Sequence, residues 1–265
     1  MPSILQVEGG HPLRGEITVR GAKNFVPKAM VASLLADTPS ELYNVPLIRD
    51  TDVVSDLLSL HGVEIDFDQD RGTLRMDPSN VKIASRSDID TLAGASRIPI
   101  LFCGPLLHQL GEAFIPELGG CAIGGRPIDF HLETLRKFGA IVDKQPDGVH
   151  IKRPATGLHG AIIELPFPSV GATEQTLLTA VRNEGITTLK GAAIEPEILD
   201  LINVLQKMGA IISVDTDRTI RIEGVAKLNG YRHTALPDRI EAASWAAAAL
   251  ATHGDIYVRG AHQPD

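Results

Sequence analysis

A glycine-rich segment surrounds one of the two cysteines in this 265-residue chain. The sequence ELGGCAIGGRPIDFH, residues 117–131, places Cys121 among four glycines, with Arg126 five residues after the thiol. Glycines let backbone N–H groups come close to a ligand, and a neighbouring cation lowers the pKa of a thiol. Cys121 is therefore a candidate proton donor or nucleophile. The structural alternative is that it is only a small residue in a turn.

A helix is expected directly after this segment, at Pro127 or Ile128, because proline suits a first helical turn and apolar residues at helical spacing follow. A helix N-terminus attracts anions, and an arginine such as Arg126 can bind a carboxylate or phosphate through two hydrogen bonds. The other cysteine, Cys103, lies in the apolar run IPILFCGPLL. We expect it to be buried as a small hydrophobic residue.

Four further polar turns each precede a predicted helix: RGAKN (20–24), GASRIPI (94–100), PFPSVGAT (166–173) and LPDRIEA (236–242). Lys23 in the first turn can reach a phosphate or carboxylate, although a lone exposed lysine is usually only solvated. Arg97 begins the helix after the second turn. Helix dipoles favour an anion at these positions, while capping by Ser and Asp explains part of the pattern.

Two kinds of segment alternate along the chain, which is the signature of an internal repeat. The first kind is an apolar helix followed by a short β-rich run, at residues 22–45, 95–120, 171–192 and 239–261. The second kind is an amphipathic helix closed by a glycine and followed by two short strands, at residues 53–68, 130–145 and 198–215. The repeat predicts an α/β fold whose modules bury their helices against one another.

Glycines mark the repeat at fixed places. Gly62, Gly139 and Gly209 each stand where a helix end needs a left-handed residue. A second set of equivalent positions is spaced by 75, 72 and 69 residues, giving a period of about 70 residues: Asn44, Gly119, Gly191 and Gly260. Three modules are complete, and a fourth begins near Gly230 and stops before its second helix. We therefore expect the chain to be truncated or a fragment.

Composition excludes several classes of protein. Hydrophobic residues make up 43% of the chain and charged residues 22%, and the formal net charge is −8. An acidic chain has no general electrostatic attraction for nucleic acid or an anionic membrane. The sequence shows neither a secretory leader nor about 18 uninterrupted apolar residues, so we expect a cytoplasmic protein. Neither CxxC nor HExxH occurs, and we expect no metal and no cofactor.

The motifs RGAKN, GGCAIGGRPIDFH, PSVGAT, EPEI and LPDRIE, in this order and spacing, resemble the UDP-N-acetylglucosamine 1-carboxyvinyltransferase (MurA) family over nearly the whole chain. The resemblance implies an inside-out α/β fold of two globules, each built of three βαβαββ units, with the active site in the cleft between them. Residues 21–230 would form the first globule, and residues 1–20 and 231–265 would belong to a partial second one. The chain would end after roughly three-fifths of the family's length.

The resemblance also implies a reaction. Members of the family transfer the enolpyruvyl group of phosphoenolpyruvate to the 3-hydroxyl of UDP-N-acetylglucosamine and release phosphate, the first committed step of peptidoglycan precursor synthesis. Cys121 matches the loop cysteine that acts as general acid and is alkylated by fosfomycin, while Lys23 and Arg126 match cations that hold phosphoenolpyruvate. Asn24 would lie beside the sugar and is counted with Cys121, Lys23 and Arg126 among the implied phosphoenolpyruvate-binding residues. The implied contacts to the UDP-sugar are Arg97, Arg126, Pro127, Ile128, Asp129, Phe130, Ser169, Val170 and Gly171.

The sequence departs from the family in three places. Leu118 stands where proline usually precedes GGC, and Phe167 stands where some members have lysine. The family's base for the sugar hydroxyl and a further phosphate-binding arginine would lie beyond Asp265, so the isolated chain is expected to be inactive. Two alternatives remain open: the related shikimate-pathway enolpyruvyl transferase, which would show a GNAGT-like turn at residues 94–100, and a non-catalytic UDP-sugar-binding module.

Overall fold

The computed structural model describes residues 4, 6–93, 96–116, 118 and 127–261. The first repeat contains α1 (Val26–Ala32), the 3-10 helix η1 (Ser33–Leu35), β2 (Ser40–Tyr43), α2 (Arg49–Leu60), β3 (Glu64–Asp68) and β4 (Thr73–Asp77). The second contains α3 (Arg86–Ala93), η2 (Ile98–Phe102), α4 (Cys103–Gln109), β5 (Glu112–Ile115), α5 (Asp129–Lys137), β6 (Ile141–Gln145) and β7 (Gly148–Lys152).

The third repeat contains β8 (Ile162–Glu164), α6 (Val170–Ala180), β9 (Ile186–Lys190), α7 (Pro196–Met208), β10 (Ile211–Val214) and β11 (Ile220–Glu223). The remaining elements are β1 (Arg14–Thr18), β12 (Arg232–Thr234), α8 (Arg239–Ala251) and β13 (Asp255–Arg259). Each complete repeat therefore contains a helical segment (α1, η2 with α4, or α6), a strand, a second helix and two strands, in the order that the sequence predicts. Helix α3 in the second repeat and strand β8 in the third come before this shared set.

The three repeats build their sheets in the same way. The strands of each repeat lie in the order first, third, second and run antiparallel, as β2-β4-β3, β5-β7-β6 and β9-β11-β10. In two of the sheets a further strand adds in parallel beside the first one, β12 beside β2 and β8 beside β9. This shared topology confirms the internal repeat.

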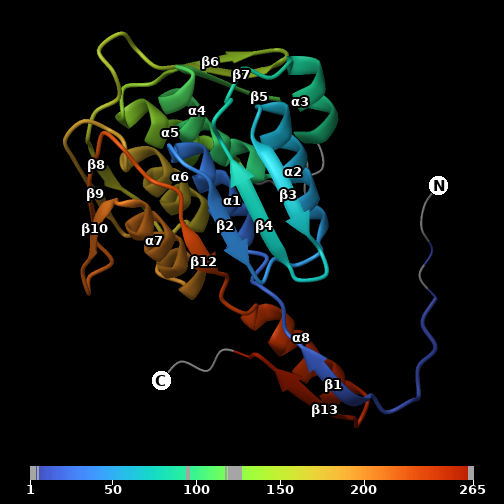
Figure 1. The fold of residues 1–265 in the computed structure, drawn as a ribbon. Coiled ribbons are helices and arrows are strands. Elements are labelled where there is room, and N and C mark those ends of the chain that lie inside the picture. Colours follow the sequence, from blue (N-terminus) through green and yellow to red (C-terminus); the bar gives the residue numbers. More distant parts are fainter. Residues whose placement is uncertain (1–3, 5, 94–95, 117, 119–126, 262–265) are drawn as a thin grey trace.

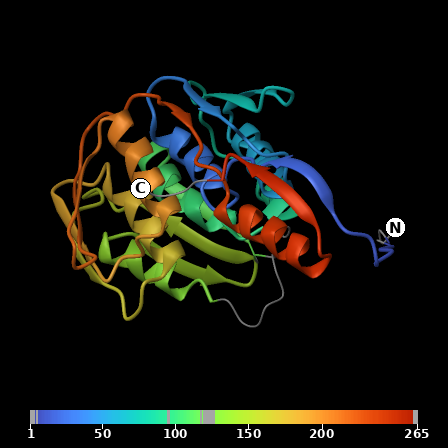
Figure 2. The same cartoon turned by 90° about the horizontal axis from the view of Figure 1, so that it is seen from below.

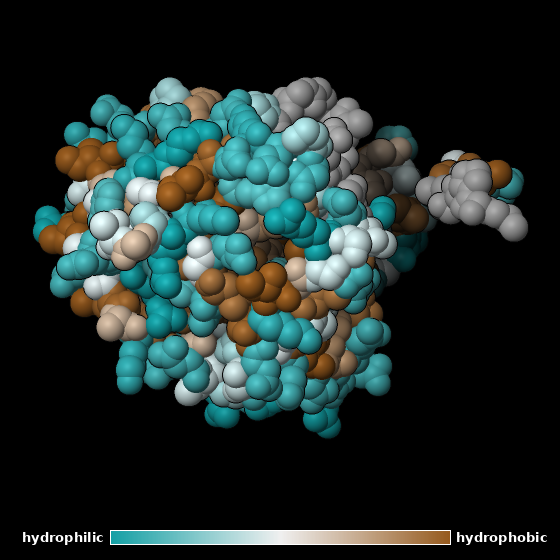
Figure 3. Space-filling view, turned by 90° about the horizontal axis from the view of Figure 1, so that it is seen from above, coloured by the Kyte–Doolittle hydropathy of each residue, from teal (hydrophilic) through white to brown (hydrophobic). Residues whose placement is uncertain are grey.

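Helices fill the middle of the main body, and the three sheets lie around them (Figures 1 and 2). The central helix α6 is buried at nine consecutive residues, from Ala172 to Ala180, so it has no solvent-facing side there. Its threonines satisfy their hydroxyls by donating to carbonyl oxygens one turn earlier, as Thr176 does to Ala172 at 2.8 Å. Hydrophilic side chains cover most of the face seen in Figure 3, with smaller hydrophobic patches among them.

The predicted left-handed positions are confirmed. Gly62, Gly139 and Gly209 follow the second-type helices with φ of 84°, 93° and 107°. At the second set of equivalent positions, Asn44, Gly191 and Gly260 have φ of 60°, 68° and 71°, and Gly119 lies outside the described residues. The left-handed backbone conformation costs glycine little energy and asparagine only somewhat more, which explains the residue types at these positions.

The chain crosses twice between the main body and a smaller part. Strand β1 precedes α1 yet pairs in parallel with β13, while β12 precedes α8 yet pairs with β2. Figure 1 shows α8, β1 and β13 together at one end of the molecule, away from the three sheets. No residue of α8 is buried, and its Leu250 is 80% exposed.

Two local predictions need correction, and a third is confirmed. The helix expected from residue 95 in the second repeat is a 3-10 segment, η2, followed by α4, and Pro99 and Pro105 lack backbone donors there. Helix α5 begins at Asp129, with Ile128 at its cap position, so the expected start at Pro127 or Ile128 is one to two residues early. Cys103 is completely buried, as predicted, and burial raises the pKa of its thiol.

Candidate functional site

The N-terminal ends of helices from three repeats meet around one cavity of about 330 Å³. Asn24 comes from the turn before α1, Arg97 from the start of η2, and Val170 and Gly171 from the first turn of α6. Four residues that sequence analysis assigned to substrate are thus brought together. The remaining lining residues are Lys28, Ile98, Ile100, Leu101, His131 and Glu174.

The segment 127–130 lines hollows next to this cavity. Pro127 and Ile128 line a hollow of about 420 Å³, and Arg97 borders both this hollow and the first cavity. Phe130 lines a third hollow and packs edge-on against Phe167, with ring centroids 5.3 Å apart. Arg97 thus joins the first two hollows, and Phe130 lines a separate one. Asp129 and Ser169 line none of the three.

Two predicted residues have structural partners of their own. The exposed carboxylate of Asp129 lies 3.7 Å from the ammonium of Lys144. The hydroxyl of Ser169 caps α6 by accepting a hydrogen bond from the backbone N–H of Ala172 at 3.3 Å. Capping therefore accounts for Ser169, as the structural explanation of these turns predicts.

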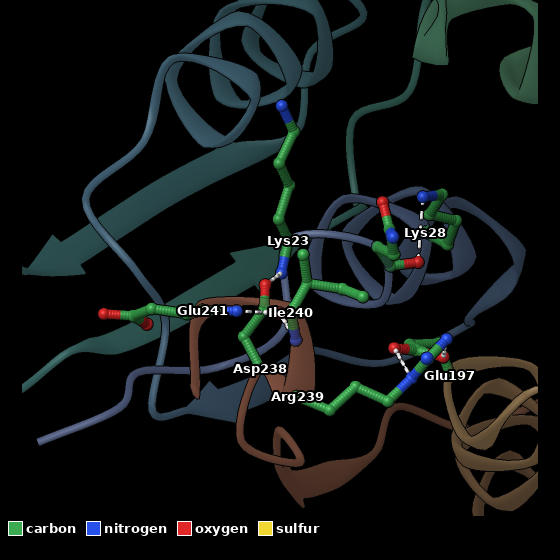
Figure 4. Close-up of polar contacts among 8 residues, drawn as sticks. Lys23, Lys28, Glu197, Asp238, Arg239, Ile240 and Glu241 are labelled. Atoms are coloured by element: carbon green, nitrogen blue, oxygen red, sulfur yellow. Dashed lines mark hydrogen bonds and ion pairs between the residues drawn. The ribbon is translucent and has the colours of Figure 1, made fainter. Parts of the chain in front are cut away.

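Lys23 lies at the junction of the first and fourth repeats. Its backbone N–H donates to a carboxylate oxygen of Asp238 at 2.9 Å, and its ammonium pairs with Asp50 at 3.3 Å. The side chain is 62% exposed and points away from Asp238 and Lys28 (Figure 4). Lys23 does not line the described cavity, although its neighbour Asn24 does.

Asp238 also caps α8, accepting from the backbone N–H groups of Ile240 and Glu241 at 2.8 and 3.1 Å. The next residue, Arg239, makes two hydrogen bonds to the buried carboxylate of Glu197, at 2.9 and 3.2 Å (Figure 4). These contacts tie the start of α8 to α7 and to the turn before α1. The motif LPDRIEA thus acts as a connection between the smaller part and the cavity wall.

Sequence reasoning missed a buried ion pair in the cavity wall. The ammonium of Lys28 lies 3.6 Å from the carboxylate of Glu174 and donates to the backbone carbonyl of Asn24 at 2.8 Å. Burial raises the pKa of Glu174 to about 7, and Glu195 and Glu197 add to this effect while Lys28 opposes it. Charged residues inside apolar helical runs, KAMVASLL and TEQTLLTAV, were the available signal.

His131 was missed as well, although it closes the quoted motif GGRPIDFH. Burial, with a smaller contribution from the nearby Arg97 and against a hydrogen bond with Gln175, lowers the pKa of its imidazole to about 4, so the ring is neutral at pH 7. The ring sits so close to Gly171 that a Cβ at that position would lie 2.8 Å from its Nε2. A side chain at position 171 would therefore force the His131 ring on α5 to shift.

Residues 119–126 of the glycine-rich segment lie outside the described residues, and with them Cys121 and Arg126. Among the residues that the structure does describe, no group of three or more His, Cys, Asp or Glu side chains is arranged to hold a metal ion. In the same described portion, no helix is long and apolar enough to cross a membrane.

Relatives with curated names match this chain over almost all of its length. It is 44% identical over 262 residues to a UDP-N-acetylglucosamine 1-carboxyvinyltransferase of Protochlamydia amoebophila and 45% identical over 262 residues to one of Acidiphilium cryptum. These alignments cover 97% and 98% of this chain but 56% and 61% of the two relatives. The chain thus spans little more than half the length of the curated relatives it matches.

Solved structures show the same fold. The enolpyruvyl transferase NikO from Streptomyces tendae superposes with a TM-score of 0.78 at 23% identity, covering 89% of this chain and 55% of that one. An EPSP synthase from Acinetobacter baumannii gives 0.68 at 19% identity, covering 89% and 52%. The sequence profile of EPSP synthase (3-phosphoshikimate 1-carboxyvinyltransferase) matches residues 7–264. The chain therefore belongs to the EPSP synthase family of enolpyruvyl transferases, with the inside-out α/β fold, and resembles its UDP-N-acetylglucosamine 1-carboxyvinyltransferases.

Proposed function

We propose that the protein serves in the transfer of the enolpyruvyl group of phosphoenolpyruvate to the 3-hydroxyl of UDP-N-acetylglucosamine. The observation that carries the proposal is the cavity in which Asn24, Arg97 and Gly171, one from each repeat, meet at helix N-termini. Such a place suits anionic ligands, because helix dipoles and an arginine favour negative charge. The names of the relatives at 44% and 45% identity support the choice of substrates.

The reaction requires an acid and fixed cations. The sugar hydroxyl gives its proton to a base, expected beyond Asp265, as its oxygen bonds to C2 of phosphoenolpyruvate and C3 takes a proton from an acid. The C2–O bond to phosphate then breaks, inorganic phosphate leaves, and C3 loses a proton to restore the double bond. We assign the proton that C3 takes to Cys121, and the neutralisation of carboxylate and phosphate to Lys23 and Arg126. The exposed pair between Lys23 and Asp50 contributes little stability, so a substrate anion can replace Asp50 at small cost.

The remaining assignments follow from the same proposal. Arg97, the segment 127–130 and the turn 169–171 would hold the UDP-sugar, and the hollows lined by Arg97, Ile128 and Gly171 are the places for it. Residues 21–230 would act as one globule, and 1–20 with 231–265 as part of another, although β12 adds to the sheet of the first repeat. The reaction would take place in the cytoplasm and supply peptidoglycan precursors, and Cys121 would be the target of fosfomycin.

Two measurements on the purified protein test the function. Calorimetric titration with UDP-N-acetylglucosamine measures binding, and release of inorganic phosphate in the presence of phosphoenolpyruvate measures turnover. Because the isolated chain is expected to be inactive, phosphate release is measured on the protein extended past Asp265, and binding together with release there supports the proposal. Binding without release supports the non-catalytic module, and phosphate release with shikimate 3-phosphate in place of the UDP-sugar supports the shikimate-pathway enzyme.

A further inference from the structure

Lys28 and Glu174 form a buried ion pair between two elements of the cavity wall. Lys28 is 7% exposed and Glu174 is 4% exposed, so water screens neither charge well. Lys28 lies in the first turn of α1, and Glu174 lies one turn after the start of α6. The pair therefore joins the helix that follows Asn24 to the helix that carries Val170 and Gly171.

The Lys28 ammonium also closes the turn before α1. This helix has only seven residues and begins after Phe25, whose side chain has no polar group with which to cap it. Lys28 instead reaches back one turn and donates to the carbonyl oxygen of Asn24 at 2.8 Å. One ammonium thus holds the backbone of a predicted substrate residue and, at 3.6 Å, a carboxylate on α6.

Stability alone does not explain why these charges are kept. A buried ion pair is often no more stabilising than apolar residues of the same volume, because both ions lose their hydration. Two more carboxylates, Glu195 and Glu197, face Glu174, and the guanidinium of Arg239 neutralises Glu197. Because burying these two charges costs hydration free energy without a matching gain in stability, we infer that the pair fixes the position of the turn carrying Asn24 relative to α6.

We propose that Lys28 and Glu174 are positioning residues, which lock the turn carrying Lys23 and Asn24 against the N-terminus of α6 and so set the shape of the substrate cavity. This inference rests on the proposed function for the identity of the substrate. It concerns two residues that contact each other and the backbone, and it assigns them no part in proton transfer.

The experiment compares four variants with the unmodified protein: Lys28→Met, Glu174→Gln, the double variant, and Lys190→Met as a control on the exposed part of β9. Affinity is measured by titration with UDP-N-acetylglucosamine, and stability by urea unfolding. We expect at least tenfold weaker binding in both single variants and in the double variant. Stability should recover in the double variant relative to Lys28→Met, because no charge is left unpaired.

A positioning role predicts that the double variant regains stability but not affinity for UDP-N-acetylglucosamine, whereas a purely structural role predicts that it regains both. If the double variant regains both stability and normal affinity, the pair is only structural and the proposal is overturned. Normal affinity in the single variants overturns it too. If the unmodified protein binds no UDP-N-acetylglucosamine, the proposed function fails. The positioning role is then tested by a measurement that needs no ligand.

Hydrogen exchange provides that ligand-free measurement. The backbone N–H groups of Phe25 and Val26 both donate to the carbonyl oxygen of Ala22 in the turn that Lys28 closes. We expect these two amides to exchange at least tenfold faster in Lys28→Met and in the double variant, and to be unchanged in Lys190→Met. Exchange rates that stay equal to those of the unmodified protein overturn the proposal.

Discussion

Removing the charge of Glu174 is predicted to abolish a specific pH dependence of stability. The carboxyl has a pKa of about 7 in the folded chain against an ordinary value of 4.5, chiefly because it is buried. Between these values the folded state holds a proton that the unfolded state releases. The free energy of unfolding contributed by this group is therefore highest below pH 4.5 and falls as the pH rises to 7.

The size of the effect follows from the shift. Each pKa unit corresponds to about 1.4 kcal/mol, so a rise from 4.5 to about 7 gives a loss on the order of 3 kcal/mol across this range. Histidines act in the opposite direction. Burial lowers the pKa of His108 and His131 to about 4, so their contribution to stability rises between pH 4 and their ordinary value of 6.5. The pH dependence of the whole protein's unfolding free energy is therefore the sum of these opposite contributions.

A difference measurement isolates Glu174. Urea unfolding of the unmodified protein and of Glu174→Gln is followed by far-ultraviolet circular dichroism from pH 4.5 to 8. The unfolding free energy of the unmodified protein minus that of Glu174→Gln should fall by about 3 kcal/mol as the pH rises from 4.5 to 7, and this difference should stay constant above pH 7. Glu223→Gln, an exposed change on β11, is the matched control. A difference curve that is flat to within about 1 kcal/mol would refute the reasoning.

Three further changes have defined outcomes. Gly171→Ala places a Cβ 2.8 Å from the His131 ring, so it should lower the unfolding free energy by about 1–3 kcal/mol in urea melts, and an unchanged midpoint would contradict the close contact. Asp238→Ala removes the cap of α8 and should cost about 1 kcal/mol, detected by fluorescence of Trp245 in that helix; Asp255→Ala is the control. Cys121→Ser should prevent the mass increase that fosfomycin causes, and the same adduct on this variant would end that assignment.

Much of the fold is predictable because it depends on local chemistry. The left-handed positions at Gly62, Gly139 and Gly209 follow from the need to end a helix, and repetition then gives the module. The two chain crossings are different. Nothing in the local sequence of Arg14–Thr18 indicates that this strand pairs with Asp255–Arg259, more than 200 residues away. Such pairing is decided by the packing of the whole chain.

The site divides in the same way. Asn24, Arg97 and Gly171 were predicted because they lie in polar turns at helix starts and match motifs of the family, and the structure brings them to one cavity. Lys28 and Glu174 were not predicted, since a charge on a helix is normally solvated and its burial depends on neighbours from other repeats. Only the packed helices show that these two charges meet.

The connection between the repeats explains why the cavity lies where it does. The first and fourth copies of the turn contact each other directly: the backbone N–H of Ala22 donates to Leu236 at 2.8 Å, and that of Lys23 donates to Asp238 at 2.9 Å. The same Asp238 caps α8. Because two hydrogen bonds join these turns, the residue next to Asn24 is held in place relative to the start of α8. The crossing strands thus attach the turn of the first repeat that carries Asn24 to the start of α8.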